Sequence, residues 1–369
     1  MKIAIGMDVH AKTTSAYAVY AGTGEAPDRH EKFLGDFNRE FGKFPSTAEG
    51  MEKMAAFLSK HECHALIENS TKSHEVYWML KNLGVDVTMA QAADLHRITM
   101  SVKKTDRNDS IELAGYMRRR LNGENEFSEC FVPSPEWMTK REMCRGVAAE
   151  RVYLADTKRK IRAHLLLHGI HLSKEYGNIT SDKALAELAS FKDPYLMMQI
   201  KFAQDAKKRI DMIEKTITQM FSGIRMYELI FSVTGFGVLS AAYLTSLIID
   251  AERFPSSSKF AAAFGVVPRM RASADSNPRC STTHRGDDLA RELLMFCTLA
   301  HIKHSPDSVV TEMYDRLVKN GKPKREAPVA ASRKLLTVVW SVLKSGKPYT
   351  NDEGTLRLAR ETEGSEKER

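Results

Sequence analysis

Short apolar runs with the length and residue types of strands recur through the first third of the chain. They occupy residues 2–9, 13–22, 30–37, 63–69 and 85–91, and the first two are expected to pair as a hairpin. Helical spacing occupies residues 46–61, opened by a capping box from Ser46 to Glu49, and also residues 73–84 and 111–121. Strands that come first and then alternate with helices predict a mixed α/β sheet domain over residues 1–125.

The rest of the chain has a helical pattern. Over residues 126–222, isoleucine, leucine and methionine recur three and four positions apart, which predicts two long helices in a hairpin or a dimerising coiled coil. Residues 223–350 combine short helical segments with a middle rich in glycine, serine and arginine, so a mainly helical C-terminal domain is expected. The polar tail 351–369 is expected to be disordered. The predicted fold class is α/β plus α.

Composition narrows the choice of partner and compartment. Of 369 residues, 55 are lysine or arginine and 47 are acidic, giving a net charge of +8, which favours a polyanionic partner over an acidic small molecule. A merely basic surface is the alternative. The five cysteines are scattered, with no CxxC pair, which indicates reduced thiols. No signal peptide or membrane span is evident, because no apolar run approaches about 18 residues. A cytoplasmic protein is expected.

Carboxylates stand at the ends of predicted elements in the sheet domain. Asp8 ends the first strand, Glu68 ends a later one, and Asp106 and Asp109 are spaced to share one face of a helix. Together they would supply enough oxygens for Mg²⁺ (or Mn²⁺), an arrangement suited to phosphodiester displacement. Taken singly, Asp8 could simply be a turn residue. Asp106 and Asp109 could be a helix N-cap and an acid of the first helical turn, where the helix dipole favours negative charge. Their common position at element ends favours the metal site.

The segments that carry these acids resemble a known family. GMDVHAKTTSAYAV (6–19), LIENST (66–71) and KKTDRNDS (103–110) resemble, in order and spacing, the motifs of the DEDD-type insertion-sequence transposases, which include the Piv-type DNA invertases. Residue 110 is serine where the family has alanine, a change without consequence for charge. The resemblance implies an RNase H-like (RuvC-like) domain with a catalytic, metal-binding tetrad. Carried over by position, that tetrad is Asp8, Glu68, Asp106 and Asp109.

A glycine pair opens the C-terminal segment. In FSVTGFGVLSAAYL (231–244), Gly235 and Gly237 precede an apolar helix. They are candidate nucleic-acid contacts, because backbone N–H groups at a helix N-terminus bind phosphate. A simple tight turn explains them equally well.

A serine-containing segment extends the resemblance. FAAAFGVVPRMRASADSNPRCSTTHRGDDLARELL (260–294) resembles the centre of the family's C-terminal transposase domain, and residues 314–336 resemble its closing region. The resemblance places the family's catalytic nucleophile on Ser273. Alanine follows that serine where the family has glycine, and Asp275 adds negative charge, so Ser276 and Ser281 remain alternatives.

Basic residues near the motifs are candidate nucleic-acid contacts. Arginines beside the serine would hold a phosphate and stabilise its charge. The candidates are Lys103, Lys104, Arg107, Arg269, Arg271, Arg279 and Arg285. KRKIR (158–162) and the arginine run 118–120 are further candidates for backbone contacts, although solvated helix faces account for them equally well.

The resemblance implies a DNA recombinase in which a serine forms a covalent intermediate with DNA. It further implies a composite site between subunits of a homo-oligomer (dimer or tetramer), target and donor DNA as partners, and a structured bridge RNA that selects them. The implied setting is a bacterial or archaeal cytoplasm, in association with the nucleoid. No membrane partner is expected.

Four other interpretations remain open. A site-specific DNA invertase would use the same residues, and a RuvC-like junction nuclease would use the acids alone, without a covalent intermediate. A sugar kinase or ATPase would use the opening strand to bind phosphate, but His10 and Ala11 stand where such proteins need glycine. A scaffold that binds nucleic acid would not need the acids at all.

Overall fold

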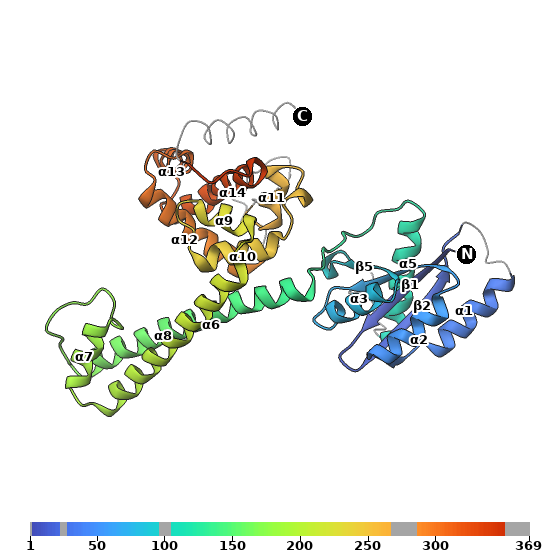
Figure 1. Cartoon of the computed structure of the whole chain (residues 1–369), viewed down its shortest axis with the longest axis horizontal. Coiled ribbons are helices and arrows are strands. Elements are labelled where there is room, and N and C mark those ends of the chain that lie inside the picture. The colour runs from blue at the N-terminus through green and yellow to red at the C-terminus, as the bar shows by residue number, and fades with distance from the viewer. Residues whose placement is uncertain (1, 23–27, 96–104, 267–285, 351–369) are drawn as a thin grey trace. The chain divides into compact units, whose positions relative to one another are not determined.

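The computed structural model describes residues 2–22, 28–95, 105–266 and 286–350, which form two compact units (Figure 1). The first unit spans Met1–Ser134 and the second Pro135–Arg369. Among the described residues there are 13 α-helices and one five-stranded sheet. The predicted helical hairpin and C-terminal domain fall within the second unit, where they share a hydrophobic core. The predicted disordered tail lies outside the described residues.

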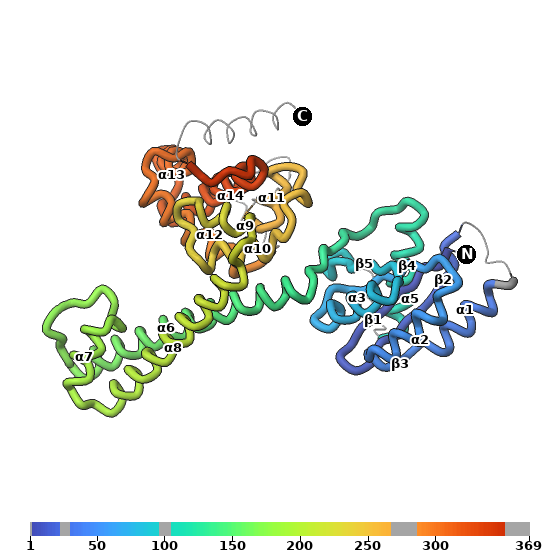
Figure 2. Tube along the Cα trace, in the orientation of Figure 1, coloured from blue at the N-terminus to red at the C-terminus, as the bar shows by residue number. Residues whose placement is uncertain are grey.

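The first unit is built on a mixed sheet whose strands are labelled in Figure 2. The strand order is β3-β2-β1-β4-β5. The strands are β1 (Lys2–Val9), β2 (Thr13–Tyr20), β3 (Phe44–Pro45), β4 (Glu62–Glu68) and β5 (Asp86–Ala90). β1 pairs antiparallel with β2, which confirms the predicted hairpin, and parallel with β4, which pairs parallel with β5.

Helices cover both faces of this sheet. Alternate residues of β1, such as Ile5 and Met7, pack in a core with residues of α1 (Asp28–Glu40), α2 (Ala48–Leu58) and α3 (Ser73–Asn82). Ala4, whose side chain points to the opposite face, shares a second core with Leu66 and with residues of α5 (Asp106–Leu121). Each strand therefore presents its odd and even positions to different layers, as strand geometry requires.

Three local predictions need correction. The segment 30–37 is part of the helix α1 and not a strand, because Phe33, Phe37 and Phe41 recur every four residues and pack on one side. The N-cap of α2 is Thr47 and not Ser46, since the Thr47 side chain accepts a hydrogen bond from the Gly50 N–H. The helix predicted at 111–121 begins at Asp106, five residues earlier.

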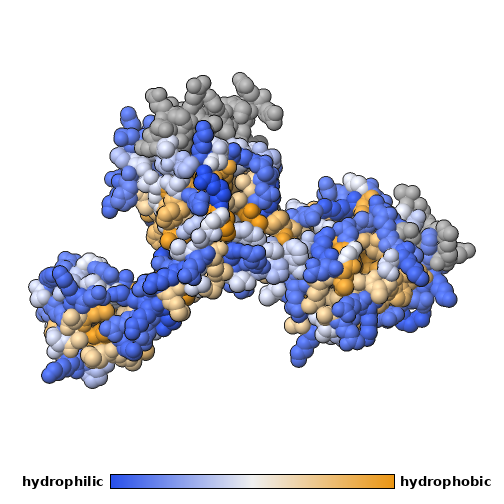
Figure 3. All heavy atoms as spheres, viewed as in Figure 1, coloured by the Kyte–Doolittle hydropathy of each residue, from blue (hydrophilic) through white to orange (hydrophobic). Residues whose placement is uncertain are grey.

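The second unit contains a long helical hairpin. α6 (Pro135–Leu167) packs against α8 (Pro194–Phe221), and α7 (Asp182–Ser190) lies in the connection between them. Ion pairs of Glu150 with Arg209 and of Arg151 with Glu214 join the two long helices. Figure 3 shows hydrophobic surface among hydrophilic residues at the end that carries α7. The predicted pair of long helices is thus a hairpin within one chain.

A bundle of shorter helices completes the second unit. It comprises α9 (Arg225–Ser232), α10 (Val238–Ile248), α11 (Ser257–Ala263), α12 (Asp288–His304), α13 (Val309–Lys319) and α14 (Ala327–Ser345). α10 is buried nearly all round and packs against α6, α8, α9 and α12. Within the described part of the chain, no helix is long and apolar enough to cross a lipid bilayer.

Candidate functional site: an acidic cluster between a sheet and a helix

Asp8 and Glu68 lie on neighbouring parallel strands. Met7 of β1 is opposite Ile67 of β4, so Asp8 and Glu68 follow at adjacent positions at the same end of the sheet. Glu68 shares a face with Leu66, two residues before it, whose side chain packs with α5. The sheet therefore brings the first two predicted acids to the face that α5 covers.

Gly6 allows α5 to approach this face closely. A Cβ atom at this position would lie 2.1 Å from the Ser110 carbonyl oxygen and 2.2 Å from the Ala114 nitrogen, both in the backbone of α5. Only glycine permits that separation. The first turn of α5 carries Asp106 and Asp109, and its N-cap is Thr105, which accepts a hydrogen bond from the Asn108 N–H. The close approach places both acids of this turn near Asp8.

His10 lies between two of the carboxylates. Its Nε2 is 3.1 Å from Asp8 Oδ2 and 3.3 Å from Asp106 Oδ1. Lys43 approaches from the segment before β3, with its Nζ 3.8 Å from Asp106 Oδ2. Asp109 is buried on α5, whereas His10 and Lys43 are exposed. The cluster thus faces solvent on one side and the helix on the other.

The charges of the cluster act on one another. Burial raises the pKa of the Asp8 carboxyl above its ordinary value, and the carboxylates of Asp109 and Asp106 raise this pKa further, whereas His10 acts to lower it. The carboxylates that raise the pKa of Asp8 are held beside it against their mutual repulsion. A cation at this position would relieve that repulsion.

The donor set fits a divalent metal ion. Asp8, His10 and Asp106 each offer one ligand atom, and these atoms lie within 4.8 Å of one another. Carboxylate oxygens are the ligands of Mg²⁺ and Mn²⁺, and an imidazole nitrogen suits first-row transition metals. Asp109 lies on the same first turn of α5 as Asp106, and Glu68 ends β4 beside the end of β1.

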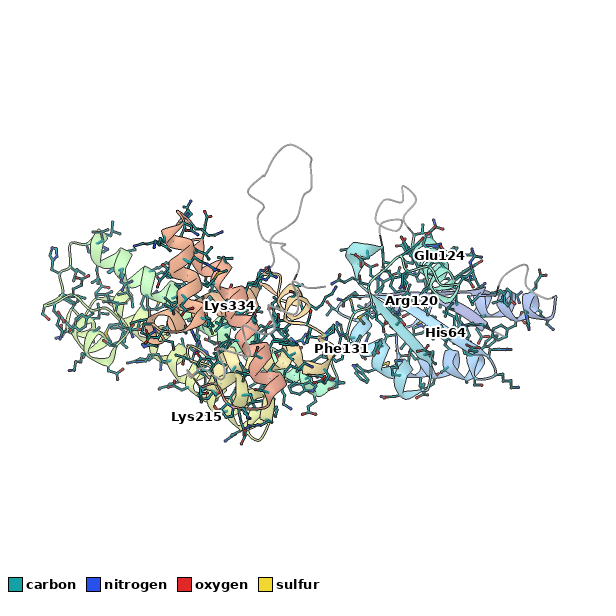
Figure 4. All side chains as sticks on the ribbon, turned by 90° about the horizontal axis from the view of Figure 1, so that it is seen from above. His64, Arg120, Glu124, Phe131, Lys215 and Lys334 are labelled. Atoms are coloured by element: carbon teal, nitrogen blue, oxygen red, sulfur yellow. The ribbon has the colours of Figure 1, made fainter. Side chains whose placement is uncertain are left out.

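The predicted basic contacts fall into three groups. Arg107 is exposed beside Asp106 at the start of α5. Arg119 and Arg120, which is labelled in Figure 4, are paired with Glu126 and Glu129. Arg118 is exposed on α5, and KRKIR (158–162) lies on α6, where Arg159 and Lys160 are paired with Asp156. The remaining candidates lie outside the described residues, as does the predicted nucleophile with its two alternatives. They are Lys103, Lys104, Arg269, Arg271, Ser273, Ser276, Arg279, Ser281 and Arg285.

The two glycines of the C-terminal segment have different surroundings. Gly235 has a φ of +97°, and a Cβ there would lie 2.4 Å from the Cys297 carbonyl oxygen in α12. Gly237 is the N-cap of α10 in an extended conformation, and its N–H donates a hydrogen bond to Ser240 Oγ at 2.9 Å. Close packing accounts for the first glycine, and the cap for the second. Their role as nucleic-acid contacts stays a prediction.

A polar network holds Asp287, which lies within the serine-containing segment 260–294. Tyr243 donates to Asp287 Oδ1 at 2.8 Å, and Arg145 donates to Asp287 Oδ2 at 2.8 Å and to the Tyr243 hydroxyl at 3.0 Å. Asp287 is also the N-cap of α12. Gly286, with a φ of +113°, packs against Gly265, so the described residues that flank residues 267–285 lie together.

Residues of this bundle match a transposase family. Residues 227–313, from α9 to α13, match the family model of the IS116/IS110/IS902 transposases. Over this region, the chain is similar to insertion-sequence transposases. The match covers the glycine pair, the serine segment, and Tyr243 and Asp287 of the polar network.

The individual proteins that this chain resembles are distant in sequence. A candidate transposase of Sinorhizobium fredii, y4qE, is 21% identical over 77% of this chain and 76% of its own length. The 42 kDa protein of insertion element IS900 from Mycobacterium paratuberculosis is 32% identical over 36% of this chain and 33% of its own. The transposase of insertion sequence element IS1533 from Leptospira borgpetersenii is 25% identical over 51% of each chain.

Three residues of the site were not predicted from the sequence. His10 had a signal, because it lies two positions after Asp8 and so continues the alternation of the strand toward the same side. Gly6 had one as well, since glycine inside an apolar strand marks a close backbone approach. Lys43 had none, because its position near Asp106 depends on how the segment before β3 runs beside the sheet.

Proposed function

We propose that this protein is a transposase that cuts and rejoins DNA with an acidic cluster that binds Mg²⁺ or Mn²⁺ and with a serine nucleophile. The observation that carries the proposal is the convergence of Asp8, His10 and Asp106 at the end of β1 and the start of α5. The transposase match over residues 227–313 supports DNA as the substrate. A mixed sheet with acids at the ends of β1 and β4 supports an RNase H-like assignment of the first unit.

In this mechanism, Asp8, Glu68, Asp106 and Asp109 would hold a divalent ion and so fix where the DNA phosphate lies. When bound, a divalent ion stabilises the attacking and leaving oxygens of a phosphodiester displacement. Lys43 and Arg107, which flank Asp106, contribute positive charge toward the DNA backbone. The carboxylates would otherwise repel that backbone.

The serine step balances in two displacements. Ser273 Oγ bonds to phosphorus as the bond from phosphorus to one bridging DNA oxygen breaks, which frees a DNA hydroxyl. A hydroxyl of the partner strand then attacks the phosphoserine, and the serine is released. The polar network of Arg145, Tyr243 and Asp287 holds the start of α12, which follows Ser273 in the chain. The family resemblance extends the proposal to a homo-oligomer, a bridge RNA and a nucleoid-associated, cytoplasmic setting.

Trapping the adduct tests the serine step. Full-length protein with substrate DNA and Mg²⁺ is quenched in denaturant, and the attached residue is mapped by mass spectrometry. We expect an adduct on Ser273 that Ser273→Ala abolishes. An adduct on Ser276 or Ser281 would show that this serine, and not Ser273, is the nucleophile. DNA cuts that need Asp8 but leave no adduct would favour a RuvC-like nuclease, and inversion products would favour a DNA invertase.

A further inference from the structure

His10 is placed as a ligand among the carboxylates. Its Nε2 lies 3.1 Å from Asp8 Oδ2 and 3.3 Å from Asp106 Oδ1. A divalent ion in octahedral coordination holds its ligands at about 2.0–2.1 Å, so neighbouring donor atoms are about 3.0 Å apart. The two separations around His10 are close to that spacing. His10 Nε2 therefore stands to each of these carboxylate oxygens as a neighbouring ligand of one coordination shell would.

The backbone of His10 is held in place by buried groups. Its N–H donates to the Thr13 carbonyl oxygen at 2.9 Å, which closes the turn between β1 and β2. Its carbonyl oxygen accepts from Ser46 Oγ at 2.9 Å. Ser46 is buried, and its hydroxyl lies 2.7 Å from that of the buried Thr14. A side chain on a turn fixed in this way is pre-organised, as metal ligands usually are.

We infer that His10 is a metal ligand of the acidic cluster and that its nitrogen shifts the preference of the site from Mg²⁺ toward Mn²⁺. The inference rests on the metal role proposed above for Asp8 and Asp106. Mg²⁺ favours oxygen ligands, whereas imidazole nitrogen suits transition metals, whose affinity for nitrogen-containing sites rises along the first row. A site with one imidazole among carboxylates binds both ions and discriminates between them.

A different role for His10 predicts the opposite effect. If the imidazole served as a counter-charge that occupies the position of the cation, it would compete with the metal. Removing it would then strengthen binding of both ions. The sign of the change in Mn²⁺ affinity therefore separates a ligand from a counter-charge.

Calorimetric titration of the full-length protein with MnCl₂ and with MgCl₂ measures both affinities. Loss of outer-shell partners alone typically weakens metal binding by about 10- to 100-fold, so His10→Ala is expected to weaken Mn²⁺ binding at least about tenfold. Mg²⁺ binding should change less than Mn²⁺ binding. Equal or tighter Mn²⁺ binding by His10→Ala would overturn the inference.

His64→Ala is the matched control. His64, labelled in Figure 4, also contacts two carboxylates of the same sheet, with Nδ1 2.6 Å from Asp86 Oδ2 and Nε2 3.3 Å from Glu62 Oε1. It lies four residues before Glu68 in β4, about 13 Å away along the strand. We expect this variant to bind both ions like the wild type. A similar loss of Mn²⁺ affinity in His64→Ala would overturn the assignment to His10.

Pulsed electron paramagnetic resonance gives a second, direct readout. Mn²⁺ bound to the wild type should show coupling to a ¹⁴N nucleus, and this coupling should be absent in His10→Ala and His10→Gln. Coupling that persists in both variants would contradict the inference. Asp8→Asn distinguishes an error in the assignment of His10 from an error in the proposed metal site. If the wild type binds neither ion, or Asp8→Asn binds both like the wild type, the metal site itself is wrong.

Discussion

Replacing Gly6 with alanine should disturb both the stability of the first unit and its proposed metal site. The new Cβ would lie 2.1 Å from the Ser110 oxygen and 2.2 Å from the Ala114 nitrogen. Both atoms belong to the backbone of α5, so no side-chain rotation relieves the overlap. The helix must move by about 1.3 Å to restore a contact of about 3.4 Å. Overpacking costs about 1 to 3 kcal/mol, and we expect the upper end because backbone is involved.

Urea unfolding of the full-length chain measures this cost. A loss of 3 kcal/mol lowers the midpoint by about 1.5 M if the m value is about 2 kcal/mol/M. Movement of α5 also carries Asp106 away from Asp8, so we expect Mn²⁺ affinity to fall at least about tenfold.

Gly115→Ala, on the same helix, is the control, because its Cβ would meet only the end of the Arg119 side chain, at 3.3 Å. Alanine favours helix over glycine by about 1 kcal/mol, so this variant should be as stable as the wild type or more stable. If Gly6→Ala matched the wild type in both midpoint and Mn²⁺ affinity, the close packing of β1 against α5 would be refuted.

Three further predictions concern other positions. Gly235→Ala should lower the melting temperature markedly, because the residue has a positive φ and its Cβ would meet the Cys297 backbone. Gly237→Ala, with open space around the new Cβ, should change the melting temperature little. Equal melting temperatures of the two variants would contradict this prediction. Burial alone would raise the pKa of the Asp287 carboxyl, but its hydrogen bonds lower this pKa below the ordinary value of 3.8. The ionised carboxyl therefore stabilises the fold above pH 3.8. This contribution is lost as the pH falls through the lowered pKa. Asp287→Asn should therefore lose less stability than the wild type between pH 6 and pH 2 in urea unfolding, and an equal loss would refute the assignment. Ser46→Ala should leave the protein folded but weaken Mn²⁺ binding in calorimetry, because the carbonyl of the metal-site turn loses its hydrogen bond; unchanged affinity would show that this bond does not position the turn.

Much of the first unit follows from its sequence, because buried strands leave a strong local pattern. β1, β2, β4 and β5 lie within or close to their predicted runs. The helix α1 was missed because eight residues, 30–37, are too few to separate period two from period four, and the deciding repeat extends to Phe41.

The candidate site was only partly predictable. Asp8 and Glu68 could be placed at strand ends, but their adjacency depends on the register of β1 and β4, which apolar runs do not fix. The contact of Lys43 with Asp106 arises from the tertiary packing of segments far apart in the sequence. In the second unit, the hairpin followed from its spacing, whereas the network around Asp287 joins α6, α10 and α12 and leaves no local signal.

A recombination assay with Asp8→Asn tests most directly whether the carboxylates of the acidic cluster act in the reaction. The full-length protein and its insertion sequence are combined, and excised and inserted junctions are counted. Asp86→Asn, an acid of the same sheet that contacts His64 instead of the cluster, serves as the control. We predict that Asp8→Asn yields no junctions while still binding nucleic acid in a gel-shift assay, and that Asp86→Asn recombines like the wild type. Wild-type recombination by Asp8→Asn would contradict the claim that these carboxylates act in the reaction.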